Sequence, residues 1–358
     1  MSALQYKGVG STVQKIQPLE DPRWDEFVFR SPNSTVFHTA EWLRALRRTY
    51  GYEPVAFTTS SADDSIENAL LFCRVQSWLT GNRLVSLPFS DHCAPLVQNP
   101  DDVSRLFSAA ESEIVSKKMD YLELRTQTPL QVRSSFPRSE KSYCFHCLDL
   151  TVDLDTLFRA FHRDCTRRKI RRAEREGLTY EEGRSDALLD VFYRLMLITR
   201  RRHRLPPHPR SWFENLADCC GDRLTIRVAS HEGQPAAAVL TLRHKGTLVY
   251  KYGASDARFH SLGPMHLLLW RCIQHAKREG MTAFDLGRSS VRDAGLIKFK
   301  DRWGAARSTL TYARYGVPGR FEYRSDGTWQ EKVAKQVVSC LPEPLFVGVG
   351  QLLYRHIG

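Results

Sequence analysis

Apolar and polar positions follow two kinds of pattern along residues 1–150. Over 39–51 and 103–119, apolar residues recur at the spacing of an amphipathic helix. Shorter apolar stretches bounded by turn-forming residues predict strands at 53–60, 67–77, 82–89 and 120–127. The pattern therefore predicts a mixed α/β unit rather than a strict strand–helix repeat.

A second series of elements begins near Thr151 with a helical region. Strands, a helix and a further strand follow at 224–233, 234–256, 263–280 and 281–287. Pro264 suits the first turn of that helix, and Gly280 suits its end. Because both series run helix, antiparallel strands, helix, strand, the chain is predicted to hold two similar α/β units with a cleft between them.

The predicted units span 17–150 and 151–318, and a helical tail spans 319–358. Near its end the tail carries apolar residues that suit one helix face: Leu345, Phe346, Val349, Leu352, Leu353 and Ile357. Prolines and glycines interrupt this stretch, which makes it too short and too broken to cross a bilayer. Two interpretations stay open: the tail packs on the body, or it contacts a membrane peripherally.

The composition is that of an ordinary globular protein, with 42% apolar and 26% charged residues among 358. A net charge of +12 favours polyanionic partners such as phosphates, RNA or an anionic membrane surface. The N-terminal segment lacks the apolar core of a secretory signal, and the nine cysteines are scattered and odd in number. These features predict a reduced, cytoplasmic protein.

The sequence CFHC at 144–147 invites a zinc interpretation. It lies in a predicted strand, where Cys144 and Cys147 would point to opposite faces, and no second Cys/His pair lies at finger spacing. No metal site is expected.

A basic segment at 161–177 predicts a helix with a stripe of arginines four residues apart: Arg163, Arg167, Arg171 and Arg175. One interpretation is a solvated face offset by Glu174 and Glu176. The other is a phosphate-binding surface for RNA, a nucleotide-linked substrate or an acidic lipid headgroup. A second basic run at 199–210 strengthens the latter.

Two further stretches place charge beside apolar bulk. Asp285 and Arg288 lie in FDLGRSS, and Lys300 lies in the expected loop GLIKFKDRWGA, 295–305. They form either a structural ion pair or a site where Lys300 and Arg288 stabilise an oxyanion or a phosphate. Asp91 and His92 follow the strand at 82–89, and His92 is either a general base or a plain surface residue.

Five segments in this order resemble the FemAB-related family of tandem GNAT-fold acyl- and aminoacyltransferases: 36–46, 167–178, 250–256, 284–290 and 299–305. The resemblance is nearest in character to acetyltransferase-like members encoded with capsule, cellulose or exopolysaccharide genes. Phe299–Lys300 and Trp303–Gly304 match the family's Phe-Lys-x-x-Phe-Gly motif, with Trp in place of the second Phe. The fold implied is mixed α/β, with two tandem GNAT-like domains sharing a cleft.

The resemblance implies an acyltransferase without metal or tightly bound cofactor. The donor implied is a thioester, acyl-CoA or an acyl carrier, and the acceptor is an amine or hydroxyl of a cell-envelope or exopolysaccharide precursor. Two alternatives remain: an aminoacyl-tRNA-dependent aminoacyltransferase, and a non-catalytic binding protein of envelope assembly. The absence of a long coiled-coil insertion leaves the thioester donor open. We expect a cytoplasmic location, with peripheral contact of the tail at the inner face of the membrane as an alternative.

Site residues follow from the same resemblance. Lys300 is expected to stabilise the oxyanion or a donor phosphate, Asp285 to orient Lys300 or act as base, and Tyr252 to donate a hydrogen bond. Helix starts bind anions, and Arg258 and Gly263 loosely match the coenzyme A loop of GNAT enzymes. The residues expected to bind the donor are Arg258, Gly263, Arg288, Arg167 and Arg171. Those expected to face the cleft and hold the acceptor are His38, Asp91 and His92.

Overall fold

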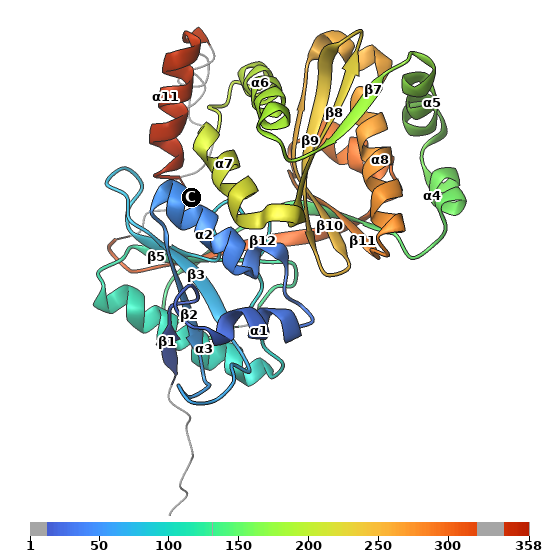
Figure 1. The fold of residues 1–358 in the computed structure, drawn as a ribbon. Helices are drawn as coiled ribbons and strands as arrows, with labels where there is room; N and C mark the ends of the chain where they lie inside the picture. The colour runs from blue at the N-terminus through green and yellow to red at the C-terminus, as the bar shows by residue number, and fades with distance from the viewer. Residues whose placement is uncertain (1–12, 131, 321–339, 358) are drawn as a thin grey trace, which may run out of the picture.

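The computed structural model describes residues 13–130, 132–320 and 340–357, and in these twelve strands form one mixed sheet (Figure 1). The strands are β1 Gln14–Ile16, β2 Glu53–Thr58, β3 Leu70–Val75, β4 Arg83–Val85, β5 Tyr121–Thr126, β6 Arg138–Asp149, β7 Thr179–Gly183, β8 Leu224–His231, β9 Gln234–His244, β10 Thr247–Ser255, β11 Ala283–Ser290 and β12 Ala306–Gly316. The helices are α1 Arg23–Arg30, α2 Ala40–Tyr50, α3 Pro100–Ser116, α4 Leu154–Ala160, α5 Arg168–Arg175, α6 Asp186–Arg202, α7 Arg210–Cys220, α8 Pro264–Arg278, α9 Ala294–Asp301 and α11 Glu343–Tyr354.

The order of strands repeats from the two edges of the sheet toward its centre. Strands β1 to β4 are antiparallel neighbours and β4 pairs in parallel with β5. Strands β7 to β10 are likewise antiparallel, and β10 pairs in parallel with β11. The expected mixed α/β fold of two similar units is confirmed in this repeat.

The last strand of each half is exchanged between the halves. Strand β6 follows β5 in the chain but pairs with β11, whereas β12 follows β11 but pairs with β5. Strands β6 and β12 then pair with each other at the centre. The expected boundary at residue 150 falls just after β6, whose sheet neighbours both come from later in the chain. The bounds 17–150, 151–318 and 319–358 stay predictions, and part of the tail, 321–339, lies outside the described residues.

The two halves also share a hydrophobic core. Helices α2 and α7 pack together, and the fully buried rings of Trp42 and Trp212 lie 5.3 Å apart, edge to face. A second core lies under α8, where Leu268, Phe284 and Trp303 are buried. Buried aromatic rings of this size contribute much of a core's stability, so the halves are held together by packing as well as by strand pairing.

Capping residues begin and end helices at the positions that the sequence predicted. Thr39 accepts a hydrogen bond from the Trp42 N–H at the start of α2, and Gly51 ends that helix in the left-handed conformation, with φ 72°. Two expectations were wrong. The segment 161–177 is not a regular α-helix throughout: it opens with a π-helical turn, Arg163–Arg167, that continues into α5, so Arg163 falls out of the predicted stripe whereas Arg167, Arg171 and Arg175 keep their four-residue spacing. The expected loop at 295–305 is mostly α9, because Asp293 caps it by accepting from the Leu296 N–H.

Helix α11 lies at the edge of the molecule, against the connection between α6 and α7 (Figure 1). It buries Phe346, Gly350 and Tyr354, and the Tyr354 hydroxyl donates to the Pro206 carbonyl. The tail thus packs on the body, as one of the two interpretations predicted. In the described part of the chain, every helix falls short of the length and apolar character that crossing a bilayer requires.

Candidate active site

A cavity of about 860 Å³ opens where β10 and β11 separate. The two strands pair only over Thr247–Val249 and Ala283–Asp285, and their later residues line the cavity together with α6, α8 and α9. Six basic side chains line it: Lys169, Arg200, Arg202, Lys251, Arg288 and Lys300. The acidic residues in the lining are Asp91 and Asp293. This excess of positive charge makes the cavity suited to an anionic ligand.

Lys300 lies at the end of α9, and its side chain lines the cavity beside β11. It is 3% exposed, and its Nζ donates hydrogen bonds to the carbonyls of Gly287 and Arg288, at 2.9 and 3.0 Å. Gly287, with φ 70°, forms the bulge in β11 that turns these carbonyls toward the amine. An ammonium group has three hydrogens, so one remains for a ligand. Burial lowers the pKa of Lys300 to about 8, so it is charged at neutral pH.

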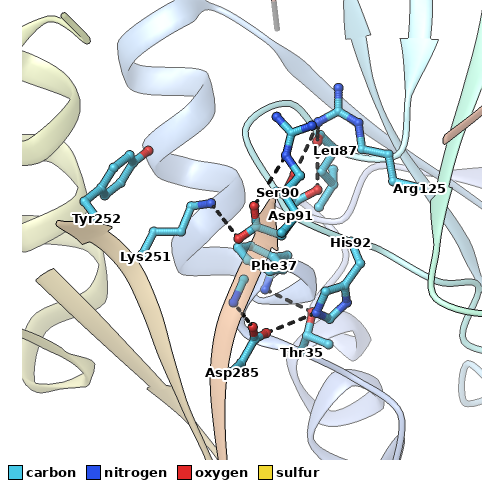
Figure 2. Close-up of polar contacts among 12 residues, drawn as sticks. Thr35, Phe37, Leu87, Ser90, Asp91, His92, Arg125, Lys251, Tyr252 and Asp285 are labelled. Atoms are coloured by element: carbon cyan, nitrogen blue, oxygen red, sulfur yellow. Dashed lines mark hydrogen bonds and ion pairs between the residues drawn. The ribbon is translucent and has the colours of Figure 1, made fainter. Parts of the chain in front are cut away.

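Lys251 lies on β10 and pairs across the two halves with Asp91 from the loop after β4. The Lys251 Nζ is 3.2 Å from Asp91 Oδ2, and the side chains are 6% and 13% exposed (Figure 2). The ammonium also lies 5.2 Å from the Phe37 ring centre and 5.7 Å from that of Trp42. Burial lowers the pKa of Lys251, and Asp91 opposes this shift. Lys251 is a site residue that the sequence analysis missed.

Asp91 is held in place from both sides. Its backbone carbonyl accepts from the Tyr312 hydroxyl at 2.7 Å, and its Oδ1 lies 3.7 Å from Arg288 Nε. Burial acts to raise the pKa of Asp91, but Lys251 and then Arg288 outweigh burial, so the pKa lies below its ordinary value. Asp91 is therefore an ionised carboxylate that the first half inserts into the cavity of the second.

Asp285 was expected to orient Lys300, but it does not do so directly. Its Oδ2 lies 3.2 Å from His92 Nε2 (Figure 2). Its Oδ1 accepts a hydrogen bond from the Gly287 N–H at 2.6 Å. The His92 ring is buried and packs edge to face against Phe37 and Phe145. Asp285 and His92 therefore form a pair behind the cavity wall, where His92 is neither a surface residue nor part of the lining.

His38 is also not part of the lining. It is fully buried, its Nδ1 accepts from the Thr35 N–H, and its Nε2 bonds the Ala94 carbonyl at 3.0 Å. Burial lowers its pKa to about 4, which keeps the ring neutral. Of the three expected acceptor residues, Asp91 alone reaches the cavity.

Tyr252 and Gly263 do line the cavity, whereas Arg258 does not. The Tyr252 hydroxyl accepts from Trp212 Nε1 at 2.8 Å, and burial raises its pKa. Arg258 points to solvent and pairs with Asp256, because the residues Ala257–Leu262 form a 3-10 helix. The expected match to a coenzyme A loop therefore fails at its arginine.

The expected donor residues Arg167 and Arg171 lie outside the cavity, whereas Lys169 between them lines it. The Arg171 guanidinium lies over the Phe158 ring, 5.5 Å from its centre. Lys169 is brought in because Gly263, with φ 81°, packs against its backbone, where an added Cβ would lie 2.8 Å from the Lys169 carbonyl oxygen.

The basic run at 199–210 contributes Arg200 and Arg202 to the cavity lining, and neither was predicted as a site residue. Arg202 donates to the Ser255 carbonyl at 3.0 Å and to His260 Nε2 at 3.3 Å. The side chains of Arg200 and Lys169 have no hydrogen bond or ion pair to any residue that the structure describes. Two unpaired cations on the wall of a cavity are available to an anionic ligand. No group of three or more His, Cys, Asp or Glu in the described residues is arranged to hold a metal ion.

The chain is similar to several known proteins. Residues 160–300 match the family described as acetyltransferase (GNAT) domain. A curated relative, UDP-N-acetylmuramoylpentapeptide-lysine N(6)-alanyltransferase of Weissella viridescens, is 28% identical over 138 residues. That alignment covers 38% of this chain and 41% of the relative, so the chain matches less than half of the relative's length.

Two solved structures share the fold over most of the chain. FemX has a TM-score of 0.62 at 15% identity, over 83% of this chain and 96% of its own. A tandem GNAT protein from the clavulanic acid biosynthesis pathway has a TM-score of 0.52 at 12% identity, over 86% of this chain and 100% of its own. The resemblance expected from the five sequence segments is confirmed, as is the tandem GNAT-like fold.

Proposed function

We propose that this FemAB-related protein is an aminoacyltransferase, which moves an aminoacyl group from tRNA to an amine of a cell-envelope precursor. The observation that carries the proposal is the cavity whose lining holds two buried lysines, Lys251 and Lys300, and two cations with unpaired side chains, Lys169 and Arg200. The name of the curated relative supports it, since that enzyme transfers alanine to the lysine amine of a muramoylpentapeptide precursor. An aminoacyl-tRNA donor is thus favoured over a thioester donor.

The loop before α8 supports the same choice of donor. A pyrophosphate of coenzyme A would need free backbone N–H groups at this helix start. Here the N–H groups of Arg258, Phe259 and Gly263 bond to Asp256 and His260 within the loop and Pro264 has no N–H, so this helix start offers fewer free N–H groups than an open one. The positive charge comes instead from side chains on the cavity wall, an arrangement suited to the phosphates of an RNA end.

The inner end of the cavity carries the chemistry of the proposal. The acceptor amine attacks the carbonyl carbon of the aminoacyl ester, a C–N bond forms, the C–O bond to the ribose breaks, and the amine proton ends on the ribose oxygen. The remaining N–H of Lys300 stabilises the oxyanion of the tetrahedral intermediate. Lys251, held by Asp91, carries a proton that passes to the departing ribose oxygen and is restored from the amine.

The acceptor in this proposal enters from the side of the first half, because Asp91 reaches the cavity from there. An ionised carboxylate at this point can accept a hydrogen bond from the neutral acceptor amine and orient it for attack. We also propose that the protein works in the cytoplasm at the inner face of the membrane, where tRNA and lipid-linked envelope precursors are both present.

Ligand binding distinguishes the proposed donor from its competitors. Aminoacyl-tRNA should raise the melting temperature of the protein, whereas acetyl-CoA at saturating concentration should leave it unchanged, because only a ligand bound to the folded state stabilises it. The measurement is a thermal shift at low salt, with the Arg200→Glu variant as control, in which the tRNA shift should shrink. A larger shift with acetyl-CoA would favour the thioester donor, and no shift with either ligand would favour a non-catalytic binding protein.

The lowered pKa of Lys300 predicts how the rate depends on pH. Only the protonated amine stabilises an oxyanion, so transfer should fall as pH rises through about 8. The measurement is the single-turnover rate between about pH 7 and about pH 9, a range in which an unperturbed lysine stays charged. Arginine also stays charged there, so any residual activity of Lys300→Arg should lack this fall. A wild-type rate that is constant over the range would contradict the role of Lys300.

A further inference from the structure

The connection between β3 and β4 exposes two large apolar side chains at its tip. Trp78 is 79% exposed and Leu79 is 49% exposed. Exposed tryptophan at a loop tip has no role in the core, and a tryptophan ring with a polar N–H is well suited to the boundary between water and lipid. The question is what this tip contacts.

The tip is fixed to the C-terminal end of the described chain. The Trp78 ring lies 5.2 Å from the His356 ring, edge to face. The His356 carbonyl accepts from Arg83 at 2.8 Å and also from the Thr80 hydroxyl. Ile357 follows at once and is 47% exposed. Trp78, Leu79 and Ile357 therefore form one exposed apolar group rather than separate residues.

Helix α11 extends this group. Its buried face is formed by Phe346, Gly350 and Tyr354, yet its outer face carries Leu345 and Leu352, which are 58% and 57% exposed. Between Glu343 and Arg355 the sequence contains no charged residue. A helix packed on one side of a water-facing surface is ordinarily polar on its other side, and α11 is not. We call the residues Trp78, Leu79, Leu345, Leu352 and Ile357 the apolar end.

Basic residues lie on the segments next to the apolar end, where the exposed Glu343 at the start of α11 is the acidic residue on the helix. The carboxylate of Asp120 accepts from the Asn82 N–H at 2.8 Å, which brings the exposed Lys117 and Lys118 to this loop. The Asp120 carbonyl accepts from the Val317 N–H, which brings in the turn that carries the exposed Arg320. Arg355 is exposed at the end of α11. We call Lys117, Lys118, Arg320 and Arg355 the basic rim.

We propose that the apolar end is a docking surface for an anionic lipid bilayer. Tryptophan, leucine and isoleucine side chains enter the boundary of headgroups and acyl chains, and the basic rim binds the anionic headgroups. A second copy of this chain fits less well, because a two-fold contact through this surface would bring the two basic rims together.

Docking in this way places the cavity beside the membrane. Arg201 on α6 donates to the Leu341 carbonyl at 2.7 Å, and its guanidinium lies 4.7 Å from the Phe346 ring centre. Its neighbours Arg200 and Arg202 line the cavity. A lipid-linked acceptor would thus reach the cavity without leaving the bilayer. This last step rests on the proposed function, whereas the docking surface does not.

Sedimentation with lipid vesicles tests the docking surface. The full chain should bind vesicles of phosphatidylglycerol and phosphatidylcholine, bind pure phosphatidylcholine weakly, and lose binding as salt rises. The double change Trp78→Ser and Leu79→Ser should lower the affinity at least about tenfold, because it removes two large apolar side chains from the lipid boundary. Phe29→Ser is the matched control, since Phe29 is 76% exposed on α1 and should have no effect.

Three results would overturn the inference. The first is no binding to anionic vesicles by a folded wild-type protein, and the second is an equal loss of binding in Phe29→Ser. The third is a concentration-dependent dimer that the Trp78→Ser and Leu79→Ser changes abolish, which would assign the surface to a second copy. Transfer to a soluble acceptor amine is measured on the same variants. It should be unchanged, so failure of docking and failure of the transfer proposal give different results.

Discussion

Replacing Lys300 by methionine should lower the rate of aminoacyl transfer about a hundredfold or more while the protein stays folded, the scale for losing one oxyanion-stabilising group. Methionine has nearly the length of lysine and is suited to a site that is 3% exposed. It cannot donate to the developing oxyanion, so the transition state loses this stabilisation while ground-state packing is kept. The measurement is single-turnover transfer at saturating donor, beside thermal unfolding of the same preparation.

Lys298→Met is the matched control for this change. Lys298 lies on the same helix, α9, but its side chain is exposed, so transfer should stay at the wild-type rate. A purely structural role of Lys300 predicts the opposite result: a lower melting temperature with unchanged turnover in the protein that remains folded. Full transfer activity in folded Lys300→Met would exclude the catalytic role.

Asp91→Asn should destabilise the protein by about 3–5 kcal/mol, the usual cost of removing one partner from a buried ion pair. The change leaves the Lys251 ammonium beside aromatic rings without its carboxylate, and it removes the negative charge that holds Arg288. Transfer should be lost as well, because Lys251 would give up its proton or leave its position. Urea unfolding gives the stability, and single-turnover transfer on the folded fraction gives the rate.

A second variant separates the two effects. Asp91→Asn combined with Lys251→Met removes both charges, so much of the lost stability should return, whereas transfer should not. Asp293→Asn is the control for a cavity carboxylate, because Asp293 is exposed and asparagine can still cap α9. Wild-type stability in Asp91→Asn would show that the pair with Lys251 is not formed in solution.

Local pattern predicted much of the fold and part of the site. The helix at 263–280 and the strand before it place Tyr252 and Gly263 at the cavity, and the strand ending in FDLGRSS brings Arg288 beside Lys300. Tyr252 lies within β10, but Gly263 lies at the start of α8, and Arg288 and Lys300 lie near the ends of β11 and α9. Such positions are marked by turn residues and by the change of hydrophobic period, so they can be found from sequence.

Other features depend on contacts between distant segments. Lys251 lies inside a strand whose neighbours are apolar, and the sole signal was a charge in LVYKYGAS that has to be paired if it is buried. Its partner Asp91 lies 160 residues away. The pairing of Asp285 with His92 instead of Lys300 likewise depends on how the two halves meet. A strand's own sequence specifies its two faces but not which strand lies beside it, so the exchange of β6 and β12 was not predicted.

The exchange of β6 and β12 has a consequence for synthesis on the ribosome. When the first half has emerged, β5 has no neighbour on its inner side, because β12 is the last of the described strands to be translated. The edge of β5 therefore stays open while most of the second half is made, and an open strand edge is a site of wrong pairing with other nascent chains. A chaperone that shields extended segments during translation would matter most for this protein in that interval.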